Sequence, residues 1–237
     1  MKRKVNRYII HKIIRAVRDL PRMFLKLPDP RLIMTLLVKN EEELLERNLL
    51  FHKAMGVDAF IVTDNNSTDG TCRIIEKYRR KGWVVDVIRE VATGYEQKEW
   101  VDRMIWKAKT SFGADWVINA DADEFWYAPS GSLKKELSES RANVLTCEVR
   151  SMYPEEDKPF WQWSKAVRPV TDIEAYDLSL YSLFERQNRK VIHRTDGYLQ
   201  ISMGNHKVRM LPQYAKSSAI RVYPKIRKQS QWQSQLQ

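Results

Sequence analysis

The run Asp121-Ala122-Asp123-Glu124 is the segment of this sequence best suited to chemistry. It directly follows residues 116–120, which have the length and apolar character of a buried strand. Carboxylates this close together raise one another's pKa unless a divalent cation neutralises them. A hard cation held by one or two carboxylates has coordination positions left for phosphate oxygens, so the run predicts a site for a metal and a nucleotide diphosphate. The alternative is an acidic loop that caps a helix.

A second polar cluster is the loop 64–70, which follows another apolar segment. Asp64 stands where that strand should end, and its carboxylate can accept a hydrogen bond from the imide N–H of a nucleobase. Thr68 and Asp69 are better explained as caps of the helix that follows. We therefore expect Asp64 to contact a ligand and the other two to be structural.

Apolar segments of strand length alternate with helical patterns from residue 31 to residue 120. We expect strands at residues 31–38, 59–63, 83–88 and 115–120, and helices at 40–55, 71–81 and 96–111. Asn40 and Glu43 resemble a capping box at the start of the first of these helices. The alternation predicts an α/β fold with a mostly parallel sheet and helices on both faces. Ligands of such sheets bind beyond the carboxyl ends of the strands, where residues 39–41, 64–69 and 121–124 should meet.

Three segments in this order and spacing resemble those of family 2-like glycosyltransferases. They are residues 36–42, 64–71 and 114–125, and a weaker similarity continues through residues 190–194 and 204–206. The resemblance implies a GT-A-type, Rossmann-like fold and a DXD motif at residues 121–123. It also implies inverting, metal-dependent transfer of a sugar from a nucleotide-diphosphate sugar to the hydroxyl of a glycan or glycolipid acceptor.

The resemblance also implies roles for individual residues. Asp121 and Asp123 would bind the metal and the sugar diphosphate, with Glu124 beside them in the catalytic centre. His206 would complete the metal site, and an imidazole ligand suits Mn²⁺ better than Mg²⁺; the alternative is a hydrogen-bonded loop histidine. Asp64 would contact the base. The nucleotide-sugar site as a whole would comprise Lys39, Asn40, Glu41, Asp64, Asn66, Lys98 and Arg103, of which Lys98 and Arg103 are possible counter-charges for the diphosphate.

The acceptor side is less defined. An inverting transfer needs a general base, and its candidates are Glu155, Glu156, Asp172, Glu174, Asp177 and Glu185. Trp126, Trp161 and Trp163 could stack on sugars, although packing explains such tryptophans equally well. The segment 221–228 lacks the late histidine of many family members. Two other functions stay open: a nucleotidyltransferase, disfavoured because residues 37–40 contain no glycine, and a non-catalytic membrane scaffold.

The charge of the chain is concentrated at its ends. Residues 1–26 carry nine Lys and Arg against the single Asp19, a net charge of +8, and residues 207–237 carry +7, which leaves −4 between them from the total of +11. This distribution disfavours nucleic-acid binding. Residues 5–20 predict a basic amphipathic helix, so we divide the chain into an N-terminal helix (1–28) and a glycosyltransferase domain (29–237). The helix would lie on an anionic membrane or dock on its own domain.

The remaining features bear on location. The chain contains Cys72 and Cys147 without disulfide or metal spacing, which indicates a reducing compartment. We find neither a signal-peptide core nor an apolar stretch long enough to span a bilayer. Together with the basic N-terminal helix, these observations predict a cytoplasmic protein that is peripheral on the inner face of the membrane. For a glycosyltransferase, this location would suit a role in envelope polysaccharide or glycolipid synthesis.

Overall fold

The computed structural model describes residues 2–25, 27–90, 97–152, 155–166, 169–170, 185–186 and 189–227. Its helices are α1 (Lys2–Arg18), α2 (Leu45–Ala54), α3 (Thr71–Arg80), α4 (Gln97–Phe112) and α5 (Leu133–Glu139), with short 3-10 helices η1 (Leu20–Phe24), η2 (Phe160–Gln162), η4 (Met203–Asn205) and η5 (Pro212–Tyr214). Its strands are β1 (Leu32–Val38), β2 (Ala59–Asp64), β3 (Val84–Arg89), β4 (Trp116–Asp121), β5 (Glu124–Tyr127), β6 (Val144–Glu148), β7 (Arg150–Met152), β8 (Pro169–Val170), β9 (Glu185–Arg186), β10 (Arg189–Arg194), β11 (Tyr198–Ile201), β12 (Val208–Met210), β13 (Ser217–Ala219) and β14 (Tyr223–Arg227).

The centre of the molecule is a seven-stranded sheet in the order β13-β6-β10-β4-β1-β2-β3. Strands β4, β1, β2 and β3 run parallel, whereas β10 is antiparallel to both β4 and β6. Strand β1 is apolar at six of its seven positions because both of its faces are covered, as is typical of a parallel sheet. The expected α/β architecture with a mostly parallel sheet is confirmed.

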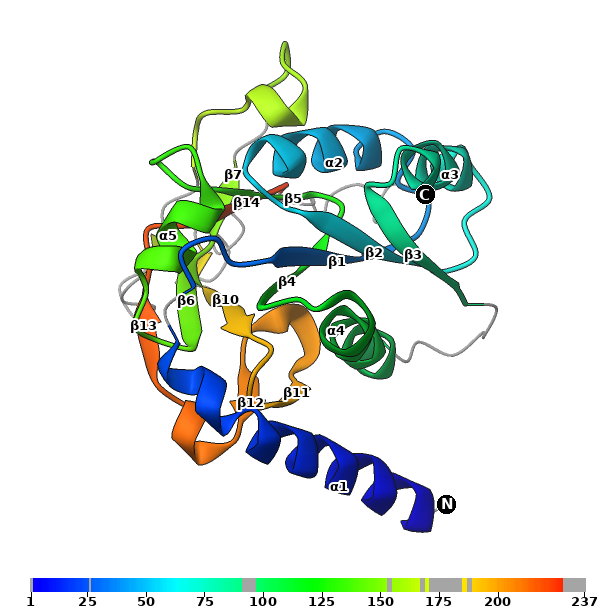
Figure 1. Ribbon diagram of the computed structural model, residues 1–237. Helices are drawn as coiled ribbons and strands as arrows, with labels where there is room; N and C mark the ends of the chain where they lie inside the picture. The colour runs from blue at the N-terminus through cyan, green and yellow to red at the C-terminus, as the bar shows by residue number, and fades with distance from the viewer. Residues whose placement is uncertain are drawn as a thin grey trace.

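Helices cover both faces of this sheet (Figure 1). One apolar cluster joins α2 and α3 to the sheet through residues such as Leu49, Ile74 and Leu36. A second cluster on the opposite face joins α4 to the sheet through Met104, Ile105 and others. Figure 1 shows α1 beyond α4, next to the β11–β12 pair.

The register of the parallel strands brings two polar residues to one edge. Val38 of β1 pairs with Asp64 of β2, and Leu37 of β1 pairs with Asp121 of β4. Both aspartates are the last residues of their strands. The carboxyl edge of the sheet therefore carries one aspartate on each side of β1.

The start of α2 differs from the expectation. The helix begins at Leu45, not at Asn40, because the Asn40 side chain is used elsewhere: its Oδ1 accepts a hydrogen bond from the backbone N of Thr68 at 2.8 Å. Asn40 also has a φ of 55°, a left-handed conformation that asparagine tolerates better than most residues. The capping box inferred from Asn40 and Glu43 is therefore wrong.

Two buried polar side chains of α2 hold the loop between β4 and β5. Asn48 Nδ2 donates to the carbonyl oxygens of Ala122 and Glu124, each at 2.9 Å. The backbone N–H of Trp126 donates to His52 Nε2 at 3.0 Å, so the ring proton is on Nδ1, which lies 2.9 Å from both oxygens of Asn48. Burial lowers the pKa of His52 to about 3, and the ring is neutral. The path of the acidic loop is thus set by a neighbouring helix.

We expect His52 to make the fold sensitive to acid. Because its pKa falls from 6.5 to about 3 on folding, the native state binds fewer protons than the unfolded chain between these values. The contribution of His52 to the free energy of unfolding is complete above pH 6.5. Each pH unit below this value should lower that free energy by about 1.4 kcal/mol. Urea unfolding at neutral pH and at about pH 5 measures the slope, which should be shallower in His52→Gln.

The matched control is His11→Gln, which removes an exposed histidine of α1 and should leave the slope unchanged. Equal pH dependence in the native protein and in His52→Gln would contradict the assignment of a neutral, buried imidazole.

Candidate functional site

Two loops at the carboxyl edge of the sheet form one hydrogen-bonded unit. The backbone N–H of Asn40 donates to Ser67 Oγ at 3.0 Å, and that of Glu41 donates to Thr71 Oγ1 at 2.7 Å. Together with the bond from Thr68 N to Asn40, these contacts fix loop 39–42 against loop 64–71. Lys39 is exposed on this unit, and Asn66 has a φ of 54°. The residues expected to line a nucleoside site are therefore adjacent.

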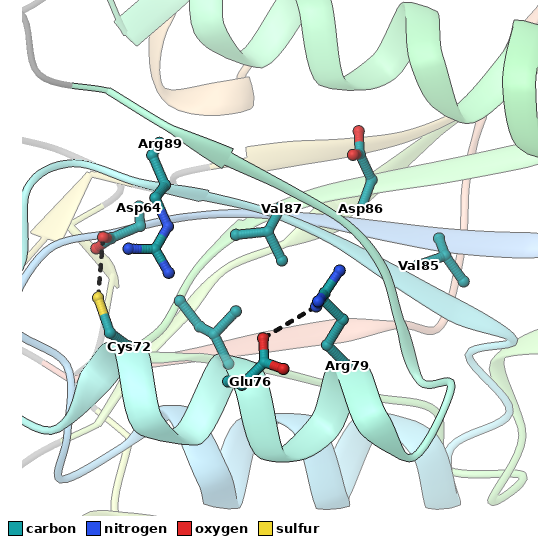
Figure 2. A pocket seen from close by; sticks show the side chains of 9 residues that line it. Asp64, Cys72, Glu76, Arg79, Val85, Asp86, Val87 and Arg89 are labelled. Carbon is teal, nitrogen blue, oxygen red and sulfur yellow. Dashed lines mark hydrogen bonds and ion pairs between the residues drawn. The ribbon is translucent and has the colours of Figure 1, made fainter.

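Asp64 is buried at the base of this unit. Its Oδ1 accepts from Ser67 N and its Oδ2 from Cys72 Sγ, both at 3.2 Å. Burial, with the help of Asp64, raises the pKa of Cys72, so the thiol keeps the proton that it donates. A hollow of about 300 Å³ opens between α3 and β3, and Figure 2 shows Asp64, Cys72 and Arg89 at the same end of it. A carboxylate acceptor and a guanidinium donor thus line one cavity.

The acidic run, expected as a single cluster, is divided by the structure. The Asp121 side chain is 46% exposed at the end of β4, and Asp123 lies partly exposed in the following turn. Glu124, by contrast, is buried at the start of β5. Its Oε2 accepts from Trp126 Nε1 at 3.2 Å. Two carboxylates therefore remain at the surface of the edge, and the third is in the interior.

Lys190, a residue not identified from the sequence, balances this interior carboxylate. It lies buried on β10, contacts Glu124 Oε1 and stands 3.9 Å from Asp121 Oδ2. Burial raises the pKa of Glu124, and the neighbouring Lys190 opposes the rise. In the sequence, Lys190 belonged only to the weaker similarity at residues 190–194, which assigned it no role. Since 66 residues separate it from Glu124, no local pattern connects the two.

His206 lies beside the start of β10, which the antiparallel pairing brings toward the carboxyl end of β4. Its Nδ1 is 2.8 Å from the carbonyl oxygen of Arg189. A carbonyl only accepts, so Nδ1 carries a proton, and a metal ligand would have to be Nε2. Asn205 Nδ2 anchors the loop by donating to Asn119 O at 2.6 Å. Gly204 has a φ of 67°, a left-handed conformation that favours glycine, and a Cβ there would come within 2.7 Å of Nε2 and force the ring to shift.

These donors fit a divalent cation in chemistry but are not assembled around one position. In the ranges that the structure describes, no three His, Cys, Asp or Glu side chains form a group that could hold a metal ion. The expected set of Asp121, Asp123 and His206 is therefore not a preformed triad. Carboxylate oxygens and a neutral imidazole nitrogen at one edge are nevertheless ligands that Mn²⁺ accepts.

The two basic residues expected near the diphosphate belong to α4. Lys98 is partly exposed in its first turn. Arg103 forms an ion pair with Glu90, whose backbone N–H donates to Asp64 O at 2.9 Å. Arg103 is thus close to the loops of the edge but already has a carboxylate partner.

The acceptor side is only partly described. Glu155 accepts from Ser164 N at 2.6 Å, and its hydrogen bond with Lys158 is the main reason why its pKa falls to about 2, which makes it a weak base. Glu156 is exposed. Trp126 and Trp163 are buried, which supports packing over sugar stacking. The remaining candidates lie outside the described side chains: Trp161, Asp172, Glu174, Asp177 and Glu185.

Known proteins share this architecture. TarS of S. aureus superimposes with a TM-score of 0.53 at 16% identity, covering 83% of this chain and 37% of that one. Residues 1–349 of the same protein give a TM-score of 0.50, again at 16% identity, with coverages of 81% and 60%. The likeness shows the fold alone, that of the GT-A glycosyltransferases, and confirms the expected fold class.

Sequence comparison identifies the class of protein. The lipopolysaccharide core biosynthesis glycosyltransferase LpsC of Rhizobium meliloti (strain 1021) is 26% identical over 148 residues, which are 62% of this chain and 46% of that protein. This chain thus spans about half the length of that relative. The family model described as glycosyltransferase family 92 matches residues 39–235, which include all three loops of the edge. The chain belongs to glycosyltransferase family 92.

Proposed function

We propose that this glycosyltransferase uses a nucleoside-diphosphate sugar as donor and a divalent cation, Mn²⁺ or Mg²⁺, at Asp121. The observation that carries the proposal is the position of Asp64 and Asp121 on either side of β1 at one edge. Two strand spacings separate their backbones by about 10 Å. A single nucleotide lying across the end of β1 would reach both, with its base at Asp64 and its diphosphate at Asp121.

The Asp64 end of the site suits a base with an N–H donor. Oδ1 of Asp64 accepts from Ser67 N and Oδ2 from Cys72 Sγ, and a carboxylate oxygen has two lone pairs, so acceptor capacity remains. The neighbouring Arg89 can donate to a carbonyl of the same base. Lys39, Asn40, Glu41 and Asn66 would frame the ribose through the hydrogen-bonded loops described above.

The Asp121 end suits the diphosphate. Asp121, Asp123 and Nε2 of His206 would hold the cation, and a bound cation would stabilise negative charge on the departing nucleoside diphosphate. Glu124 and Lys190 are positioning residues in this proposal, because both are buried and contact each other. Lys98 and Arg103 would add positive charge from α4. The general base would come from the second half of the chain.

The acceptor is a further proposal. LpsC is named for lipopolysaccharide core biosynthesis, and a related role here would make the acceptor a glycan or glycolipid of the cell envelope, reached from the cytoplasmic face of the membrane. A panel of nucleotide sugars with Mn²⁺, assayed for slow hydrolysis of the donor, tests the proposal. Hydrolysis that is lost in Asp121→Asn supports it. A failure of every donor to react or bind would favour the non-catalytic scaffold, and release of pyrophosphate from nucleoside triphosphates would favour nucleotidyl transfer.

We expect the affinity for nucleoside diphosphate to depend on the cation. With few protein ligands, Mn²⁺ should bind weakly alone and tightly together with the nucleotide. Calorimetry should show tighter nucleotide binding with Mn²⁺ than with chelator, and Asp121→Asn and Asp123→Asn should each reduce the difference. Glu139→Gln is a matched control, because this exposed carboxylate ends α5 away from the edge. Equal affinity in chelator would remove the metal from the proposal.

We expect Asp64→Asn to weaken nucleotide binding by about 1–3 kcal/mol, since the amide presents a donor to the donor of the base. The substitution keeps an oxygen that can accept from Ser67 N, so the melting temperature should change little. Cys72→Ala is the control: it removes the thiol donor but keeps the acceptor. If both variants lose the same affinity, the effect comes from the loop and not from contact with the base.

A further inference from the structure

Helix α1 docks on the domain through a buried lysine. Lys12 Nζ lies 2.5 Å from Asp102 Oδ2 and donates to Leu199 O at 2.9 Å, and Tyr198 OH donates to Asp102 Oδ1 at 2.6 Å. The ammonium group also lies 5.0 Å from the centroid of the Tyr198 ring. Ala16, one turn further along α1, is fully buried. The docked face of the helix is therefore partly polar.

The apolar stripe of α1 points outward. Ile10, Ile13, Ile14 and Val17 recur three or four residues apart and are between 39% and 51% exposed. An amphipathic helix on a globular protein normally buries such a stripe. Among the residues that the structure describes, the other exposed large apolar side chains are Leu25 and Leu50, so five of these six lie within residues 10–25. A concentration of this kind marks an interaction surface.

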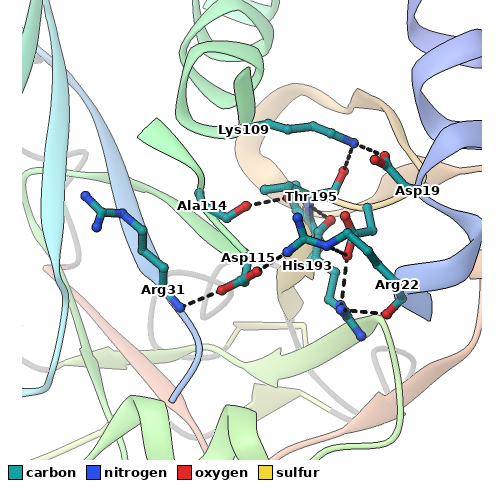
Figure 3. A network of polar contacts seen from close by, with 10 residues as sticks. Asp19, Arg22, Arg31, Lys109, Ala114, Asp115, His193 and Thr195 are labelled. Carbon is teal, nitrogen blue, oxygen red and sulfur yellow. Dashed lines mark hydrogen bonds and ion pairs between the residues drawn. The ribbon is translucent and has the colours of Figure 1, made fainter. Parts of the chain in front are cut away.

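The orientation of α1 is fixed at its C-terminal end by a network of charges (Figure 3). Lys109 contacts Asp19 and donates to Thr195 O at 2.9 Å. Arg22 lies 2.6 Å from Asp115 and 3.7 Å from Asp196. Rolling α1 to bury its stripe would separate Lys12 from Asp102 and leave both charges unpaired in the interior. The domain therefore holds the stripe in an exposed position.

We propose that this outward face of α1, defined by Ile10, Ile13, Ile14 and Val17, docks on an anionic lipid surface. Charge complementarity selects this occupant. Arg15 and Arg18 are exposed beside the stripe, and residues 1–26 carry a net charge of +8. An apolar stripe with flanking arginines lies in the interface of a bilayer and is attracted by anionic headgroups. A second copy of the chain would bring two segments of the same charge together, which opposes pairing.

The test is co-sedimentation of the full chain with vesicles. The protein should bind vesicles made of equal parts of phosphatidylglycerol and phosphatidylcholine more tightly than vesicles of phosphatidylcholine alone, and binding should weaken as salt rises. Ile10→Ser/Ile14→Ser should reduce partitioning by roughly tenfold or more, because it removes two side chains from the apolar face. Leu50→Ser, which removes an exposed leucine from α2, should partition like the native protein.

A second variant separates the electrostatic contribution to lipid binding from that of the apolar stripe. Arg15→Gln/Arg18→Gln should reduce binding to the anionic vesicles and keep the apolar stripe. All the variants change exposed side chains, so their melting temperatures should match that of the native protein. The proposal is overturned if, at low salt, the native chain binds no more tightly to vesicles with phosphatidylglycerol than to those without it. It is equally overturned if Ile10→Ser/Ile14→Ser binds as well as the native chain. It is also overturned if sedimentation equilibrium without lipid shows a dimer that Ile10→Ser/Ile14→Ser dissociates.

Discussion

Repulsion among Asp121, Asp123 and Glu124 is the constraint around which the candidate site is organised. The fold accommodates this repulsion in two ways. Glu124 turns into the interior against Lys190, which removes one negative charge from the edge, while Asp121 and Asp123 remain toward solvent. Asn48 and His52 then hold the loop in place by hydrogen bonds from α2. Strand β10 pairs with β4, and this pairing places the positive charge of Lys190 next to the acidic turn.

Elements with a local signal could be predicted from the sequence. The apolar runs of β1, β2 and β4 and the periodicity of α3 indicated a parallel sheet, and the rule that ligands bind at the carboxyl ends placed Asp64 and Asp121 at one edge. Contacts between distant segments could not be predicted in this way. Asn40 resembled a helix cap, but its hydrogen-bond partner Thr68 lies 28 residues away. Lys190 likewise lies 66 residues from Glu124. Periodicity also located α1 but did not reveal that Lys12, and not the isoleucines, would face the domain.

The site consists of two parts with different supports. Loops 39–42 and 64–71 hold each other through hydrogen bonds among Asn40, Glu41, Ser67 and Thr71. The acidic loop is held by α2 and by β10, and the His206 loop is tied to β4 through Asn205. The chain belongs to glycosyltransferase family 92, and under the proposed function one elongated ligand would contact these two parts, one at each of its ends.

The hydrogen bonds from Asn48 and His52 of α2 go to main-chain atoms of the acidic loop: the carbonyl oxygens of residues 122 and 124 and the N–H of Trp126. These three bonds therefore hold the backbone of the loop without using the side chains of residues 121 and 123. Substitutions at residues 121 and 123 would leave these bonds in place, so new ligand sets could arise at this position without loss of the contacts from α2. The framework that fixes the geometry and the groups that carry the chemistry are encoded in separate parts of the chain, an arrangement that favours the divergence of specificity on a constant scaffold.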